Sequence, residues 1–123
     1  MDTETKTLLL IFNPRAGRSK PHGPLFDAVA LLSEGGYLVR IHRTAAAGDA
    51  AQTAAREGSR YDLVVASGGD GTLNEVISGL SQLEDPPLLG YLPQGSTNDF
   101  AASLRIPSDP ERAAAAILRH RVQ

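Results

Sequence analysis

The fold is decided by the stretch Leu63-Val-Val-Ala-Ser-Gly-Gly-Asp-Gly-Thr-Leu-Asn-Glu75. Its first part is a short apolar run, which predicts a buried strand over residues 63–67. Apolar residues then recur at helical spacing and predict a helix over about residues 72–80 that buries Leu73, Val76, Ile77 and Leu80. A glycine-rich turn between a strand and a helix lets backbone N–H groups approach a phosphate closely. We therefore interpret Gly68–Gly71 as a phosphate-binding turn.

The rest of the chain repeats this alternation of strand and helix. Apolar or alternating runs predict strands at residues 7–12, 37–44 and 88–92, and helical patterns begin near residues 24, 49, 100 and 110. Strands separated by helices need crossover connections. The sequence therefore predicts an α/β fold, with a doubly wound, mainly parallel sheet and helices on both faces.

The same periodicity predicts the surroundings of individual side chains. The helix that begins at Pro24 is expected to bury Leu25, Phe26, Val29 and Leu32. The strand over residues 37–44 is expected to be half exposed, with Tyr37, Val39 and Ile41 on its apolar side. Asp49 stands where a helix N-cap is expected. The histidines show no metal-ligand spacing and are interpreted as surface residues; they are His22, His42 and His120.

Length, charge and composition narrow the class of protein. The chain has 123 residues, a length that favours one domain, and its net charge is -2. It contains no cysteine, which excludes disulfides and thiolate chemistry. No basic surface points to nucleic acid. No apolar run approaches the length of a membrane span, and the polar N-terminus is unlike a signal peptide. We expect a cytoplasmic protein, in which any membrane contact is peripheral.

Unusual turns follow the ends of three predicted strands, at Asn13–Gly17, Gly68–Thr72 and Pro93–Asp99. Ligands of parallel sheets bind beyond the carboxyl ends of the strands, so these turns are candidates for one site. A carboxylate at Asp70 would repel a phosphate by itself. It fits a nucleotide site if Asp70 holds Mg²⁺, directly or through water.

Simpler structural roles account for part of the pattern. Asn13-Pro14 and Gly17 are expected residues of an ordinary strand-to-helix turn. Thr72 and Glu75 have the spacing of a capping box, and so have Ser96 and Asp99. The glycine turn lacks the Gly-Lys-Ser/Thr ending of a P-loop and the Gly-x-Gly-x-x-Gly of a dinucleotide fingerprint.

The three motifs together resemble the diacylglycerol kinase catalytic domain. They are Asn13-Pro-Arg-Ala-Gly17, Gly68-Gly-Asp-Gly-Thr-Leu-Asn-Glu75 and Pro93-Gln-Gly-Ser-Thr-Asn-Asp-Phe100. The superfamily includes YegS/BmrU-like bacterial lipid kinases and the sphingosine and ceramide kinases. The Gly-Gly-Asp-Gly-Thr loop alone is less specific, because phosphofructokinases and NAD kinases carry similar loops. The resemblance implies an N-terminal domain of that phosphofructokinase and NAD-kinase type.

The resemblance also implies roles for individual residues. Asp70 would be the acidic residue of the loop that catalysis requires, tied to Mg²⁺ and to transfer of the γ-phosphate of ATP to a lipid hydroxyl. Asn98 and Asp99 would lie in the substrate cleft. The nucleotide would be contacted by Asn13, Pro14, Gly17, Thr44, Gly68, Gly69, Gly71, Thr72, Glu75, Ser96 and Thr97. The partners implied are the nucleotide and a diacylglycerol-like lipid at a membrane surface.

Two departures from the family pattern are visible. Ser96 stands where the family usually has threonine, which keeps a hydroxyl. Family members also continue into a C-terminal β-sandwich domain that completes the cleft and supplies the expected general base. We therefore expect residues 1–123 to form a nucleotide-binding N-terminal domain that is inactive alone. Two alternatives stay open: a non-catalytic module that binds nucleotide or forms a homodimer, and a kinase of a soluble acceptor such as NAD.

Overall fold

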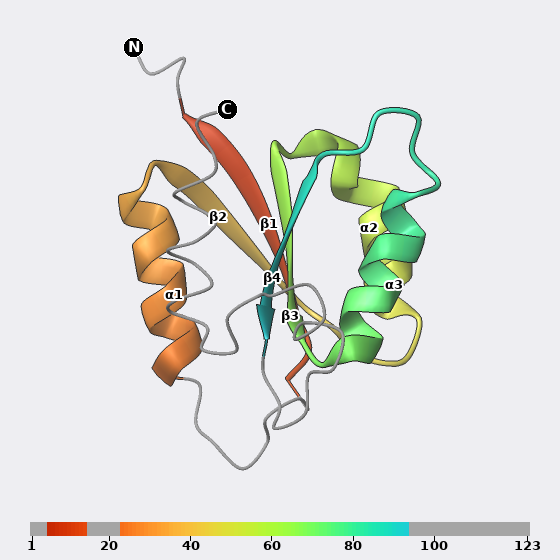
Figure 1. Ribbon diagram of the computed structural model, residues 1–123, viewed down its shortest axis with the longest axis horizontal. Coiled ribbons are helices and arrows are strands. Elements are labelled where there is room, and N and C mark those ends of the chain that lie inside the picture. The colour runs from red at the N-terminus through yellow and green to blue at the C-terminus, as the bar shows by residue number, and fades with distance from the viewer. Residues whose placement is uncertain (1–4, 15–22, 94–123) are drawn as a thin grey trace.

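The computed structural model of the chain describes residues 5–14 and 23–93 (Figure 1). Several predictions from sequence lie outside these residues. They are the two helices after residue 93, the surface positions of His22 and His120, and the site candidates Gly17, Ser96, Thr97, Asn98 and Asp99.

A parallel sheet forms the centre of the described fold. Its strands are β1 (Lys6–Phe12), β2 (Tyr37–Arg43), β3 (Leu63–Gly68) and β4 (Leu88–Pro93). They lie in the order β2-β1-β3-β4, and every neighbouring pair is parallel. Phe12 is in register with Arg43 on one side and Ser67 on the other. All four carboxyl ends therefore meet at one edge of the sheet.

Helices cover both faces of this sheet, as predicted. Helix α1 (Gly23–Glu34) lies on one face, and α2 (Asp49–Glu57) and α3 (Asp70–Leu80) lie together on the other (Figure 1). A short 3₁₀ turn, η1 (Gly58–Arg60), follows α2. Residues Leu8–Phe12 of β1 are buried throughout, because β1 is a central strand between two apolar layers.

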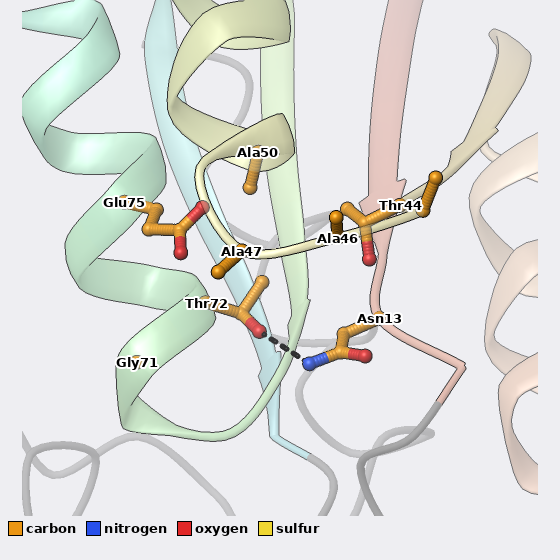
Figure 2. Close-up of a pocket in the computed structure, with 9 residues that line it drawn as sticks. Asn13, Thr44, Ala46, Ala47, Ala50, Gly71, Thr72 and Glu75 are labelled. Atoms are coloured by element: carbon orange, nitrogen blue, oxygen red, sulfur yellow. Dashed lines mark hydrogen bonds between the residues drawn. The ribbon is translucent and has the colours of Figure 1, made fainter.

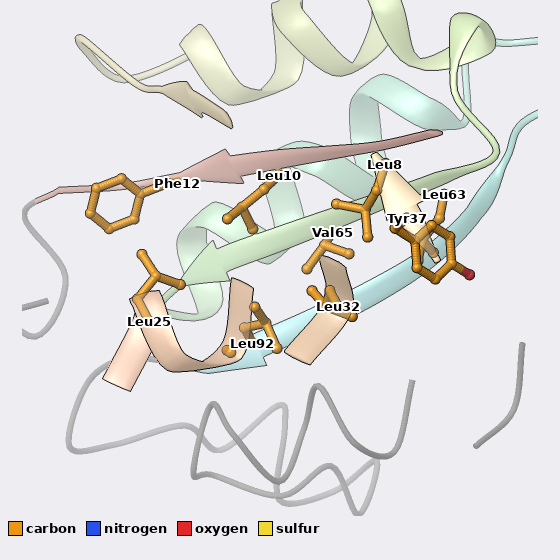
Figure 3. Packing of buried hydrophobic residues seen from close by; sticks show 10 residues of the cluster. Leu8, Leu10, Phe12, Leu25, Leu32, Tyr37, Leu63, Val65 and Leu92 are labelled. Carbon is orange, nitrogen blue, oxygen red and sulfur yellow. The ribbon is translucent and has the colours of Figure 1, made fainter. Parts of the chain in front are cut away.

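Side chains of β1 alternate between two hydrophobic clusters. Leu8, Leu10 and Phe12 pack with Leu25 and Leu32 of α1 on one face (Figure 3). On the opposite face, Leu9 and Ile11 pack in the cluster that holds the apolar residues of α2 and α3; these are Ala50, Ala54, Leu73, Val76 and Leu80.

Two predicted core positions, Phe26 and Ile77, are wrong, and Ile41 is exposed although it was expected on the apolar side of its strand. Phe26 is 64% exposed, since the buried stripe of α1 runs through Leu25, Ala28 and Leu32 and Phe26 falls beside it. Ile77 is 37% exposed for the same reason, next to the buried stripe of α3. Ile41 is 48% exposed, because β2 is an edge strand and Ile41 lies outside the cluster that covers Tyr37 and Val39.

Helices α2 and α3 approach closely at Gly79, which is buried. A Cβ atom on Gly79 would overlap the carbonyl oxygen of Ala51 and would lie 2.8 Å from the Cβ of Ala54. The atoms of α2 nearest to Gly79 belong to the alanines Ala51, Ala54 and Ala55, so backbone and methyl groups form the contact at this point. Glycine is required at position 79 for steric reasons.

We expect Gly79→Ala to lower the free energy of unfolding by about 1–3 kcal/mol, the typical cost of overpacking a tight interior contact. Chemical denaturation measures this. Ser78→Ala is the matched control, because Ser78 is exposed on the same helix and its substitution should change stability by less than about 0.5 kcal/mol. Equal stability of the two variants would contradict the helix contact.

Candidate functional site

A cleft of about 260 Å³ opens at the carboxyl edge of the sheet. It lies between the segments that follow β1 and β2 and the first turns of α2 and α3 (Figure 2). Its lining residues are Asn13, Thr44, Ala45, Ala46, Ala47, Ala50, Gly71, Thr72 and Glu75. Asn13, the first residue of the first predicted turn, therefore meets Gly71 and Thr72 of the glycine turn and the residues that follow β2. The rest of the first turn after Pro14, and the third turn after Pro93, lie outside the described residues.

Asn13 links the first turn to the glycine turn. Its backbone N–H donates to the carbonyl of Ser67 at 2.9 Å, which extends the β1–β3 pairing by one residue. Its side-chain Nδ2 donates to Oγ1 of Thr72 at 3.2 Å across the mouth of the cleft (Figure 2). Pro14 comes next, is half-buried and is not among the residues that line the cleft.

The three glycines of the turn differ in their surroundings. A Cβ on Gly68 would lie 2.6 Å from Oγ1 of Thr72 and 3.2 Å from Cβ of Asn13, so glycine is needed there for packing. A Cβ on Gly69 or Gly71 would meet no atom within 4 Å. The fold itself therefore leaves space at both positions, which is where a ligand can approach the backbone.

The capping-box interpretation of Thr72 and Glu75 is wrong. Helix α3 begins two residues earlier than predicted, with Gly69 at the N-cap position, so Thr72 lies inside the first turn. The Glu75 carboxylate instead accepts hydrogen bonds from the backbone N–H groups of Gly48 at 3.2 Å and Ala51 at 3.4 Å. Glu75 thus joins α3 to the N-terminus of α2 while also lining the cleft.

The start of α2 also differs from the prediction. Gly48, not Asp49, occupies the N-cap position, with a left-handed φ of 89° that favours glycine. Asp49 instead fixes the loop before the helix, because its Oδ2 accepts a hydrogen bond from the N–H of Ala45 at 2.7 Å. This backbone contact is the main reason that the pKa of Asp49 lies below its ordinary value, and contacts with His42 and Thr53 act in the same direction.

His42 is half-buried, which corrects its interpretation as a surface residue. Its Nε2 lies 3.1 Å from Oδ1 of Asp49 and 3.1 Å from Oγ1 of Thr53. Because the Thr53 hydroxyl donates to Asp49, Nε2 is assigned as the hydrogen-bond donor. Thr44 follows β2 and donates its N–H to the carbonyl of Phe12 at 2.9 Å. These contacts hold the wall of the cleft formed by residues 44–47.

Asp70 lies in the first turn of α3, where the helix dipole favours a negative charge. Its Oδ1 atom is shielded from solvent. The carboxylate faces Tyr91 of β4: burial raises the pKa of Tyr91 to about 12, and the Asp70 charge contributes to the shift. Among residues 5–14 and 23–93, no group of three or more His, Cys, Asp or Glu residues can hold a metal ion.

A family model described as the diacylglycerol kinase catalytic domain matches residues 7–123. The chain belongs to the diacylglycerol kinase catalytic domain family. It is 42% identical over 105 residues to the diacylglycerol kinase of Bacillus subtilis, a match that covers 85% of this chain and 35% of that protein. A diacylglycerol kinase of Staphylococcus epidermidis is also 42% identical over 105 residues, and this match covers 85% of this chain and 33% of that protein.

Solved structures agree with this assignment to the diacylglycerol kinase family. A crystal structure of a diacylglycerol kinase from Bacillus anthracis superposes with a TM-score of 0.85 at 35% identity. The superposition covers 98% of this chain and 44% of that one. The chain therefore spans between a third and a half of the length of these relatives. No helix in the described part of this family member is both long enough and apolar enough to cross a membrane.

Sequence reasoning missed two features of the candidate site. The alanine wall, made of Ala45, Ala46, Ala47 and Ala50, carries no side-chain chemistry that a motif could reveal. The strand pattern over residues 88–92 assigns Tyr91 no role in the site, yet its hydroxyl donates to the carbonyl of Gly68 at 3.0 Å. A signal for Tyr91 exists in the sequence, since a buried tyrosine hydroxyl usually has a hydrogen-bond partner.

Proposed function

We propose that this chain is the nucleotide-binding part of an ATP-dependent lipid kinase, which transfers the γ-phosphate of ATP to a hydroxyl of a diacylglycerol-like lipid. One observation carries the proposal. The Asn13 amide and the Thr72 hydroxyl meet at 3.2 Å beside the open backbone of Gly69–Gly71, at the carboxyl edge of a parallel sheet. The family assignment supports a kinase, and ligands of such sheets bind at this edge.

The two ends of the cleft differ in a way that suits the two parts of a nucleotide, its phosphates and its base. Two helix N-termini border it, and such ends attract anions. At the N-terminus of α2, the Glu75 carboxylate already accepts from two backbone N–H groups. The N-terminus of α3 carries the open positions Gly69 and Gly71. We therefore place the phosphates of ATP against α3 and the base against the alanine wall.

Mg²⁺ is the metal that the family implies, and the described residues fit it in one way. Mg²⁺ keeps several water molecules and is usually bound by one or two carboxylates together with substrate phosphates. Asp70 offers one carboxylate beside the phosphate-binding turn. Bound Mg²⁺ would offset the charge of the phosphates during transfer. In this proposal Asp70 is the acidic residue of the turn that catalysis requires, and its carboxylate holds Mg²⁺ directly or through water.

Phosphoryl transfer depends on positioning and charge stabilisation from groups around the transferred phosphate. The described cleft provides one wall of such a site: Asn13 and Thr72 orient the phosphates, and the alanine wall excludes water from the base. We propose that the chain alone binds nucleotide without phosphorylating lipid. A direct assay uses radiolabelled ATP, Mg²⁺ and diacylglycerol vesicles, with NAD as the competing acceptor. Transfer to NAD and not to lipid, by a longer form that contains this domain, would contradict the proposed acceptor.

The Gly71→Ala variant tests ATP binding separately from the stability of the fold. Gly71 lies in the first turn of α3, with open space at the position of a Cβ. Alanine should stabilise the helix by up to about 0.5–1 kcal/mol. The added methyl group would occupy space that we assign to a phosphate, and the loss of one charge-assisted hydrogen bond should weaken ATP binding about tenfold or more.

Titration calorimetry with Mg²⁺ and ATP, paired with thermal unfolding, measures both effects. The matched control is Gly48→Ala, at a position where open space also surrounds a Cβ but φ is 89°. That variant should lose stability, because alanine is strained at positive φ. Unchanged ATP affinity in Gly71→Ala would argue against phosphates at the N-terminus of α3.

A further inference from the structure

Tyr91 is a buried polar residue beside the cleft that no motif and no family comparison brings into the site. It lies on β4, is 4% exposed and packs in the cluster on the α2 and α3 face of the sheet. Its hydroxyl donates a buried hydrogen bond of 3.0 Å to the carbonyl oxygen of Gly68. Tyr91 therefore connects β4 to the first residue of the glycine turn.

The hydrogen bond from Tyr91 restrains the Gly68–Gly69 peptide, which has little steric restraint of its own. Gly68 and Gly69 lack Cβ atoms, so a peptide between them can rotate at low steric cost. No cis peptide occurs among the described residues, and in a trans peptide the C=O and the next N–H point in opposite directions. By holding the carbonyl of Gly68, the Tyr91 hydroxyl turns the N–H of Gly69 away from the buried cluster. Gly69 is the N-cap position of α3 and faces open space.

The direction of this hydrogen bond follows from its partners. A carbonyl oxygen can only accept a hydrogen bond, so the Tyr91 hydroxyl is the donor. Thr72 and Asn13 also pack tightly against Gly68, since a Cβ at Gly68 would lie 2.6 Å from Oγ1 of Thr72 and 3.2 Å from Cβ of Asn13.

We propose that Tyr91 is a positioning residue, which locks the Gly68–Gly69 peptide in the orientation that presents the Gly69 N–H to a phosphate. This inference rests on the proposed nucleotide function. Preorganised N–H donors bind anions without paying for rearrangement on binding. Tyr91 acts through Gly68 and has no contact with the ligand in this scheme.

Tyr91→Phe tests the inference, because it removes the hydroxyl and keeps the aromatic packing. ATP affinity should fall about fivefold, which corresponds to one hydrogen bond of ordinary net strength. Adenosine affinity should stay within about twofold, since adenosine has no phosphate to meet the turn. In the ligand-free protein, ¹⁵N relaxation dispersion should show new microsecond-to-millisecond exchange at Gly69. Tyr37→Phe is the matched control: Tyr37 is also buried, at 6% exposure, but lies at the amino-terminal end of β2.

Each result decides a separate point. Parallel losses of ATP and adenosine affinity in Tyr91→Phe would indicate a general structural role and overturn the inference. Wild-type ATP affinity in Tyr91→Phe, or a Gly69 amide that shows no new exchange, would overturn it while leaving the proposed function intact. Failure of the wild-type chain to bind ATP would overturn the proposed function, and the phosphate role of Tyr91 with it.

Discussion

The Gly68→Ala variant is expected to lower the free energy of unfolding by about 2–3 kcal/mol, the cost of forcing a methyl group into a packed contact. The Cβ would stand 2.6 Å from Oγ1 and 3.0 Å from Cβ of Thr72, and 3.2 Å from Cβ of Asn13. These are the two residues whose side chains join across the mouth of the cleft. Relief of the collision requires the Thr72 side chain to shift, which would disturb its hydrogen bond with Asn13. ATP affinity should therefore fall by more than about tenfold, as the positioning of the turn is lost as well.

Gly69→Ala provides the control for this prediction. Gly69 has extended backbone angles of -93° and -170°, which alanine adopts readily, and a Cβ there meets nothing within 4 Å. Its stability should stay within about 0.5 kcal/mol of the wild type. Urea unfolding of both variants measures the difference. If Gly68→Ala and Gly69→Ala were equally stable, the steric role of Gly68 would be refuted.

The alternation of strand and helix was readable from the sequence because burial on both faces leaves continuous apolar runs such as Leu8–Phe12. Parallel pairing followed from the helices between the strands. Errors arose where a side chain lies at the border of an apolar stripe, as Phe26 and Ile77 do. Helical spacing gives the period of a stripe but not its width, which depends on how the neighbouring elements cover it.

For the candidate site, the sequence located the turn but not its contacts. Three glycines around Asp70 marked the position, and the sheet topology brought Asn13 beside it. The spacing of Thr72 and Glu75 suggested a local cap, whereas Glu75 binds α2, which no local pattern encodes. Tyr91 was missed because its partner is a backbone carbonyl 23 residues away. Such contacts depend on strand order and register, which only the folded chain defines.

Asp70→Asn is expected to reverse the way in which metal affects nucleotide binding. The Asp70 carboxylate lies in the first turn of α3, beside the backbone that we assign to the phosphates. Without metal, a negative side chain repels the polyphosphate, so its neutralisation should strengthen the binding of metal-free ATP about tenfold, or ~1.4 kcal/mol. With Mg²⁺ present, the same carboxylate is an attractive ligand, and its loss should weaken binding by a similar factor. A purely structural role of Asp70 would instead change both affinities in the same direction.

Calorimetric titrations with ATP, in Mg²⁺ and in a chelator, measure the two affinities for the wild type and for Asp70→Asn. Asp62→Asn is the control, because it removes the same charge from the opposite edge of the sheet, where Asp62 accepts a hydrogen bond from the N–H of Thr7 at 2.8 Å. That variant should keep the wild-type ratio of the two affinities, since exposed charges separated by more than about 10 Å are largely screened at ordinary ionic strength. A ratio that Asp70→Asn leaves unchanged would remove Asp70 from the metal and phosphate site. A reversal seen only in Asp70→Asn would indicate that Asp70, an acidic residue among phosphate-binding glycines, binds a cation.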